Sequence, residues 1–257
     1  MDLELTGKTA LVTGASKGIG LAVAKGLAAE GCNLHLTSRT AADLENAKGI
    51  IEQAHGVDVA THAMDLSAPG NVAKLAVAVG NIDILINNAG AIPGGDIGTI
   101  NEAAWREAWD LKVFGYINMT RLFLEAMIAR GDGVIVNVVG LAGERPAANY
   151  VAGSAGNASL MALSRAIGST SMDQGVRVLA VNPGPVETDR ITTLMKARAE
   201  AELGDADRWR ELTGNWPMGR AAKPEECADL VVFAASARAS YISGVVLTID
   251  GGIGARG

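Results

Sequence analysis

Cysteine is scarce in this sequence, and its spacing carries no pattern. The two cysteines, Cys32 and Cys227, lie far apart in the chain, so they form neither a metal-binding motif nor a disulfide framework. We expect both to be small, buried, apolar residues of a protein in a reducing compartment. The sequence therefore predicts no metal site.

Long apolar runs and an excess of basic residues are also missing. Residues 1–8 carry acids where a secretory signal carries bases and an apolar run, and no later stretch holds the roughly 18 apolar residues of a membrane span. The 28 acidic residues outnumber the 22 basic ones, for a net charge of -6, which argues against polyanionic partners. We expect a cytoplasmic protein that binds neither nucleic acid nor membrane.

What the sequence does contain is an alternation of short β-rich blocks with longer stretches of helical period. This alternation is typical of strand-helix-strand units around a parallel sheet. The expected strands are residues 9–13, 33–38, 59–64, 82–87, 133–139, 176–182 and 245–249. The expected helices are residues 19–29, 41–55, 69–79, 102–130, 150–171 and 224–235. The pattern predicts an α/β fold: a doubly wound Rossmann domain, residues 1–257, with a seven-stranded parallel sheet flanked by helices on both faces.

One polar segment of helical period, residues 191–215, interrupts this alternation after the sixth strand. It is either a surface excursion or a lid over a substrate, because loops at the carboxyl ends of parallel strands are where lids occur. The sequence leaves both interpretations open.

A glycine-rich turn follows the first strand and opens directly into a helix. In this turn Gly14 allows the tight bend, Gly18 lets the backbone approach a pyrophosphate, and Gly20 allows close packing of helix on sheet. Ser16, Lys17 and Ile19 fill the rest of the turn. Because the turn lies between a predicted strand and a predicted helix, it indicates a dinucleotide site.

The end of the second strand indicates which dinucleotide is bound. An acidic residue there would bind the ribose diol of NAD(H), but this chain has Ser38 followed by Arg39. A guanidinium suits the 2′-phosphate of NADP(H), and Lys17 offers a second positive charge. We predict NADP(H) as the preferred cofactor, with NAD(H) as the alternative.

Several motifs together resemble the short-chain dehydrogenase/reductase superfamily. They are the glycine turn, Asp65-Leu66, Asn87-Asn88-Ala89-Gly90, Asn182 to Thr188, and Asp250-Gly251-Gly252. The resemblance implies adenine contacts from Asp65 and Leu66 and ribose contacts from Asn88, Ala89 and Gly90. It implies contacts to the nicotinamide end from Pro183, Gly184, Val186 and Thr188. It also implies a homo-oligomer, a dimer or a homotetramer.

The catalytic positions implied by this resemblance depart from the family pattern. The family uses a Tyr, a Lys four residues later that stabilises the phenolate from the same helix face, a Ser and an Asn. This chain keeps Tyr150 but has Ser154 at the lysine position, Gly140 at the serine position and Lys112 at the asparagine position. Three of the four positions are therefore altered.

Three interpretations of this altered tetrad stay open. In the first, Lys112 brings an ammonium to Tyr150, with Ser154 or Asn157 supplying hydrogen bonds, and the protein interconverts a small ketone and a secondary alcohol. In the second, catalysis is lost and the chain is a regulatory or non-catalytic NADP(H)-binding protein. In the third, the site carries out elimination or C–C bond chemistry without net hydride transfer.

Two charged residues near the fifth strand have both a functional and a structural interpretation. Glu144 and Arg145 are either substrate contacts or a surface ion pair. The histidines, His35, His55 and His62, fall on early elements away from the expected site, and we assign them no chemistry.

Overall fold

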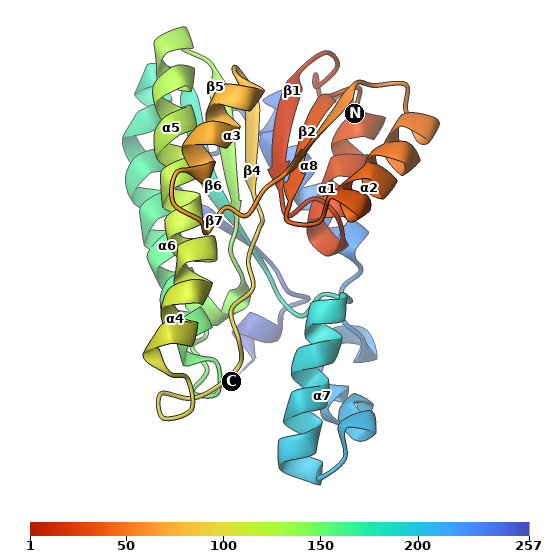
Figure 1. The fold of residues 1–257 in the computed structure, drawn as a ribbon. Helices are drawn as coiled ribbons and strands as arrows, with labels where there is room; N and C mark the ends of the chain where they lie inside the picture. The colour runs from red at the N-terminus through yellow and green to blue at the C-terminus, as the bar shows by residue number, and fades with distance from the viewer. Residues whose placement is uncertain (257) are drawn as a thin grey trace.

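The computed structural model describes residues 1–256 and contains a single seven-stranded sheet (Figure 1). All of the strand pairs are parallel, and the strand order is β3-β2-β1-β4-β5-β6-β7. The strands are β1 (Thr9–Thr13), β2 (Asn33–Ser38), β3 (Val59–Ala63), β4 (Ile84–Asn87), β5 (Gly133–Val138), β6 (Val176–Pro183) and β7 (Val246–Ile249). The predicted sheet is confirmed, with ends that differ by at most two residues.

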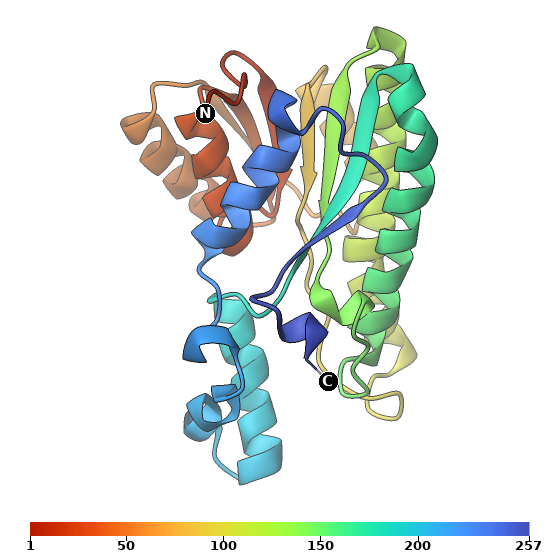
Figure 2. The same cartoon turned by 180° about the vertical axis from the view of Figure 1, so that it is seen from behind.

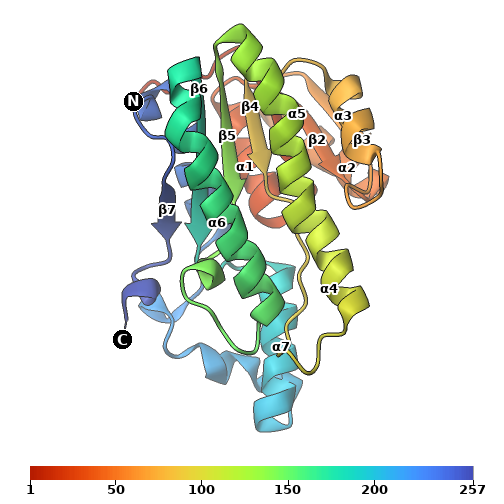
Figure 3. The ribbon, with the colours of Figure 1, turned by 90° about the vertical axis from the view of Figure 1, so that its left-hand side faces the viewer.

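Helices cover both faces of the sheet, as Figures 1 and 2 show. One face carries α1 (Gly18–Ala29), α2 (Ala41–Ala54) and α8 (Pro224–Ala235). The other carries α3 (Asn71–Val79), α5 (Gly115–Arg130) and α6 (Val151–Ser171), the last two side by side in Figure 3. Within β1, Ala10 and Val12 pack into the first layer and Leu11 into the second, because successive strand residues point to opposite faces.

The sheet reverses its direction of winding between β1 and β4. Val12 of β1 pairs with Leu36 of β2 on one side and with Ile86 of β4 on the other. In doubly wound sheets ligands bind beyond the carboxyl ends of the strands at this reversal. The glycine turn and the Asn87–Gly90 motif both begin there.

The predicted helix over residues 102–130 is interrupted. The structure has α4 (Glu102–Trp109), a π-helical turn at Asp110–Phe114, and α5. The Gly115 N–H donates to the Asp110 carbonyl, five residues back, so the turn holds one more residue than an α-helical turn. Such turns are frequent at functional sites, and this one carries Lys112.

Residues 191–215 lie in a helical segment that comes in addition to the six helices expected from the sequence. The helix α7 (Asp189–Leu203) is followed by a 3-10 segment at Ala206–Thr213, and it extends beyond the carboxyl ends of the strands (Figure 1). Met195 and Ala199 are its buried residues.

Two expectations drawn from composition can be compared with the described residues. Cys32 and Cys227 are both buried and unbridged. No helix within residues 1–256 is long and apolar enough to cross a membrane.

Candidate active site

The glycine turn packs directly against the loop that follows β4. A Cβ atom at Gly14, where φ is +65°, would lie 2.9 Å from the Ala89 Cα. A Cβ atom at Gly20 would overlap the Gly14 carbonyl. The two glycines therefore allow a close approach that no other residue type permits.

Thr13 joins the same two segments by hydrogen bonds. Its buried Oγ1 accepts from the Asn88 N–H at 2.8 Å and from the Ala89 N–H at 3.0 Å. The Asn88 side-chain amide donates to the Thr13 carbonyl at 3.0 Å. The structure thus brings the glycine turn and Asn88, Ala89 and Gly90 to one place.

The N-terminus of α1 fits the anion that the sequence predicts there. The helix begins at Gly18 with no side-chain cap and no acidic residue in its first turn, so its first N–H groups are available to a pyrophosphate. Ser16 and Ile19 are partly buried, and the exposed Lys17 has its Nζ 3.8 Å from Asp189 Oδ2. A dinucleotide fits this turn.

The end of β2 offers polar groups for the adenosine half. The buried Ser38 Oγ has no hydrogen-bond partner among residues 1–256, and a buried hydroxyl of this kind suits a ribose or phosphate oxygen. Arg39 beside it is exposed. The Ser67 hydroxyl and N–H hold the pKa of Asp65 below its usual value, with a smaller effect from Arg39, and Leu66 is buried.

The segment after β6 leads from the sheet to α7. The Gly184 N–H donates to the Ile249 carbonyl at 2.9 Å, which ties this segment to β7. Val186 is buried, and the Thr188 hydroxyl caps α7 by accepting from the Ile191 N–H at 3.4 Å. A Cβ atom at Gly18 would lie 3.2 Å from Thr188 Cγ2, so this segment lies against the glycine turn.

Tyr150 stands at the N-terminus of α6, and Gly153 makes room for its ring. A Cβ atom at Gly153 would overlap the Tyr150 ring, so the ring lies against the bare backbone of the next turn. The Gly95 N–H donates to the Asn149 carbonyl at 2.8 Å and the Val151 N–H donates to the Gly95 carbonyl at 3.2 Å. These bonds hold Tyr150 beside the loop that follows β4.

The partner of the Tyr150 hydroxyl is Arg190, which the sequence did not single out. The Arg190 Nη2 donates to Tyr150 Oη at 2.7 Å and to the Ile92 carbonyl at 2.8 Å. The available signal was an arginine two residues after the Asn182–Thr188 motif, with no acidic residue three or four positions later to form a helical ion pair.

Lys112 points to the end of β5. Its Nζ donates to the Val139 carbonyl at 2.6 Å, and its stem passes Gly90, whose Cβ would lie 2.9 Å from Lys112 Cδ. Burial lowers the pKa of Lys112 to about 7, and the positive charge of Arg190 adds to this effect. No hydrogen bond within residues 1–256 joins Lys112 to Tyr150. The hypothesis that Lys112 takes over the role of the lysine missing at Ser154 therefore stays a prediction.

The other two altered positions have partners within the protein. The buried Ser154 Oγ accepts from the Ala147 N–H at 3.0 Å and so holds the loop before α6. Gly140 has φ +133°, and a Cβ atom there would lie 3.0 Å from the Asn157 amide nitrogen. That amide donates to the Gly140 carbonyl at 3.3 Å, and the Asn157 Oδ1 is buried without a partner in the described chain.

Glu144 and Arg145 do not pair with each other. Glu144 accepts from the Asn182 amide and from the Thr248 hydroxyl, each at 3.0 Å. Arg145 donates to the Ile253 carbonyl at 2.6 Å. The interpretation of these two residues as a surface ion pair is therefore wrong. Their side chains instead tie the loop before α6 to β6 and to the C-terminal segment.

Together, the reversed winding, the glycine turn and the polar residues at the strand ends define a Rossmann-type dinucleotide-binding fold. The family model described as short chain dehydrogenase matches residues 8–199, and the chain belongs to this family. The resemblance drawn from the motifs is thereby confirmed.

Several characterised proteins are similar to the chain over nearly its whole length. It is 36% identical to galactitol 2-dehydrogenase (L-tagatose-forming) of Cereibacter sphaeroides, over 97% of this chain and 96% of that one. The structure of L-sorbose reductase from Gluconobacter frateurii, complexed with NADPH and L-sorbose, is similar with a TM-score of 0.88 and 31% identity, over 98% of both chains. An NAD+-bound xylitol dehydrogenase is similar with a TM-score of 0.89 and 26% identity, over 97% of this chain and all of that one.

Proposed function

We propose that this protein is an NADP(H)-dependent oxidoreductase that interconverts a small polyhydroxy ketone and its secondary alcohol. The observation that carries the proposal is Tyr150. Its hydroxyl oxygen accepts a hydrogen bond from Arg190, so its own proton is free for a carbonyl oxygen. The sugar and polyol substrates in the names of the similar proteins support the substrate class.

The preference for NADP(H) rests on the end of β2. Arg39 supplies the positive charge for a 2′-phosphate, and no carboxylate stands at Ser38 to repel it. The glycine turn and the first turn of α1 hold the pyrophosphate, and residues 183–188 hold the nicotinamide end. When bound, NADPH supplies the hydride that adds to the carbonyl carbon.

The residues around Tyr150 perform the proton chemistry in this proposal. Tyr150 donates its proton to the carbonyl oxygen in the direction of reduction and recovers it from solvent. Lys112, whose pKa of about 7 lies close to working pH, suits a group that gains and loses a proton during turnover. Ser154 acts indirectly by holding the loop that carries Tyr150.

The test combines cofactor titration with a substrate panel. We expect tighter binding of NADPH than of NADH by fluorescence, and oxidation of NADPH with ketoses such as L-sorbose, L-xylulose or L-tagatose. Tyr150→Phe should bind NADPH as wild type does and lose turnover. Turnover that survives in Tyr150→Phe would remove that residue from the mechanism.

A second candidate function is NADP(H) binding without catalysis. It is favoured by Gly140, which offers no side chain to a substrate, and by Ser154, whose hydroxyl is occupied by the Ala147 N–H. This function requires tight NADPH binding, no turnover on the panel, and a protein partner recovered by pull-down. Product formation without added nicotinamide would instead indicate elimination or C–C bond chemistry.

We further propose that residues 1–257 form one domain whose lid comprises residues 191–215 together with the first turn of α7. Leu194 supports this because its Cδ2 would lie 3.3 Å from a Cβ atom at Gly94, in the loop that follows β4. Substrate protection of residues 191–215 from a protease is the expected result.

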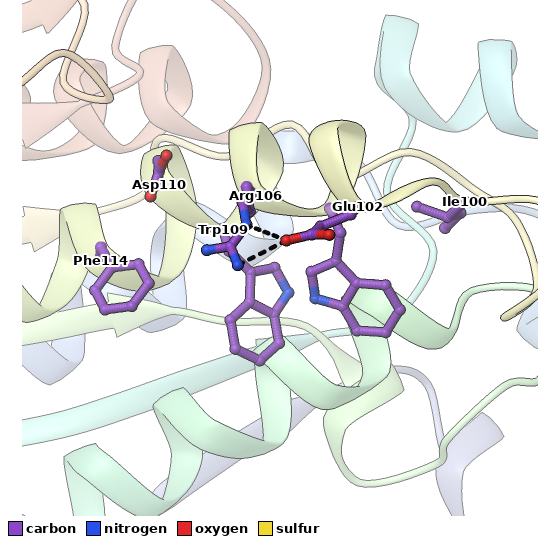
Figure 4. A pocket seen from close by; sticks show the side chains of 7 residues that line it. Ile100, Glu102, Arg106, Trp109, Asp110 and Phe114 are labelled. Atoms are coloured by element: carbon purple, nitrogen blue, oxygen red, sulfur yellow. Dashed lines mark hydrogen bonds and ion pairs between the residues drawn. The ribbon is translucent and has the colours of Figure 1, made fainter.

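The proposed homo-oligomer uses the outer side of α4. A groove there is lined by the apolar side chains of Ile100, Trp105, Trp109 and Phe114 and by the charged Glu102, Arg106 and Asp110, most of which Figure 4 labels. Phe114 is 50% exposed. Apolar side chains gathered in this way favour burial against a second copy. Sedimentation of Phe114→Glu should give a smaller species than wild type.

A further inference from the structure

Arg190 is a charged side chain that lacks a charged partner. No ion pair of Arg190 occurs within residues 1–256, and its Nη2 binds only two neutral oxygens, Tyr150 Oη and the Ile92 carbonyl. The neighbouring carboxylate on α7, Asp189, instead faces Lys17 of the glycine turn, with 3.8 Å between the charged atoms. A guanidinium without a counter-ion gains most from a partner that becomes negative.

The positive charge of Arg190 also acts on two other titratable groups, Lys112 and Tyr116. Lys112, on the π-helical turn, feels the charge of Arg190, which helps to lower the Lys112 pKa. The buried Tyr116 hydroxyl donates to the Val138 carbonyl at 2.9 Å, and burial raises its pKa. Tyr150 is therefore the group at which a negative charge meets the guanidinium directly.

We propose that Arg190 supplies, from the first turn of α7, the cation that the tetrad lacks at Ser154, and that proton transfer by Tyr150 therefore requires α7 to be docked. This inference rests on the proposed reduction of a ketone. As the proton passes from Tyr150 Oη to the carbonyl oxygen, the electrons of the O–H bond stay on the phenolate oxygen, and a bound NADPH would supply the hydride that the carbonyl carbon needs. Solvent water then returns the proton to Tyr150.

Because Arg190 and Tyr150 are open to solvent, the strength of their interaction depends on whether α7 closes over the site. Arg190 is exposed and Tyr150 is half-buried, so water screens their interaction while the site is open. A ligand held under α7 excludes that water, and the same contact becomes stronger in the lower dielectric. Arg190 thus acts through Tyr150 as a positioning and charge-stabilising residue.

The test measures the contact between Arg190 and Tyr150 without any ligand, through the resistance of α7 to a protease. Arg190→Gln and Tyr150→Phe each remove the hydrogen bond, so α7 should be cleaved faster in both variants. Arg190→Lys, which keeps a positive charge, should restore most of the resistance.

Arg220→Gln is the matched control, because Arg220 lies outside the proposed lid and pairs with Glu226 at 2.7 Å. It should leave both the protease resistance of α7 and turnover unchanged. In ketose reduction Arg190→Gln should lower kcat about 10- to 100-fold and leave NADPH affinity unchanged.

The outcomes separate the two proposals. If α7 resists the protease equally in wild type and Arg190→Gln, the pairing of Arg190 with Tyr150 is refuted whatever the activity. If Arg190→Gln loses the resistance but wild type reduces no ketone, the pairing stands and the proposed function fails. Should Arg190→Gln melt early, Arg190→Lys and 1 M salt, which screens the pair, provide the same comparison.

Discussion

Replacement of Lys112 by Met should stabilise the folded protein most at neutral pH. Met keeps the unbranched apolar stem and removes the ammonium. Burial lowers the pKa of Lys112 from 10.5 to about 7. Between these two values the unfolded chain holds a proton that the folded chain has released, so the stability of wild type rises with pH in this window. The variant lacks this dependence.

The size of the effect follows from that window. Each pH unit within it changes the stability of wild type by about 1.4 kcal/mol at most. We therefore expect the difference in unfolding free energy between Lys112→Met and wild type to shrink by about 2 kcal/mol from pH 7 to pH 9. This slope is the test, because the loss of the hydrogen bond to Val139 alters the offset but not the slope.

Urea denaturation of both proteins across this range provides the measurement. Lys74→Met on the exposed side of α3 is the control, since its ammonium stays solvated in the folded and unfolded states. A difference for Lys112→Met that stays constant with pH, or that matches the control, would refute the lowered pKa of the partly buried Lys112. The same variant should turn over ketone much more slowly while still binding NADPH.

Three further perturbations test other parts of the structure. Arg39→Ala should weaken NADPH binding about tenfold and leave NADH binding unchanged in fluorescence titrations. Gly153→Ala should displace the Tyr150 ring and lower turnover at least about tenfold at an unchanged melting temperature, whereas Gly49→Ala, with open space around it, should keep full activity. The His35 and His62 ring nitrogens lie 2.9 Å apart, and burial lowers the pKa of both. Because the unfolded chain then binds protons more readily below about pH 6.5, wild type should lose stability on acidification more steeply than His62→Gln in thermal scans.

The sheet and the dinucleotide turn could be predicted because their signals are local. Buried parallel strands appear as short apolar runs, and the glycines of the turn are needed wherever the backbone passes another segment closely. Gly14 and Gly20 meet that condition in the structure. The carboxyl ends of parallel strands then meet at one edge, which is why the glycine turn and Asn88 were expected at one dinucleotide site.

The arrangement around Tyr150 could not be predicted, because it depends on contacts between distant elements. A π-helical turn shifts a hydrogen bond by one residue and leaves the helical period of residues 102–130 almost unchanged. The contact from Arg190 to Tyr150 spans 40 residues of sequence, and no local pattern marks it. The Asn157 amide donates to the Gly140 carbonyl across 17 residues of sequence. The absence of a serine at Gly140 could be seen in the sequence, but the position of the Asn157 amide beside it could not.

The placement of Arg190 has a consequence for how activity can vary among substrates. A lysine four residues after a tyrosine on one helix is held at a fixed separation whatever is bound. Arg190 and Tyr150 belong to separate elements, α7 and α6, so the substrate that bridges them also sets how long they stay in contact. Two ketones that bind equally tightly can then differ in rate, and substitutions along α7 offer a route to a new specificity that leaves the dinucleotide site and the acid itself untouched.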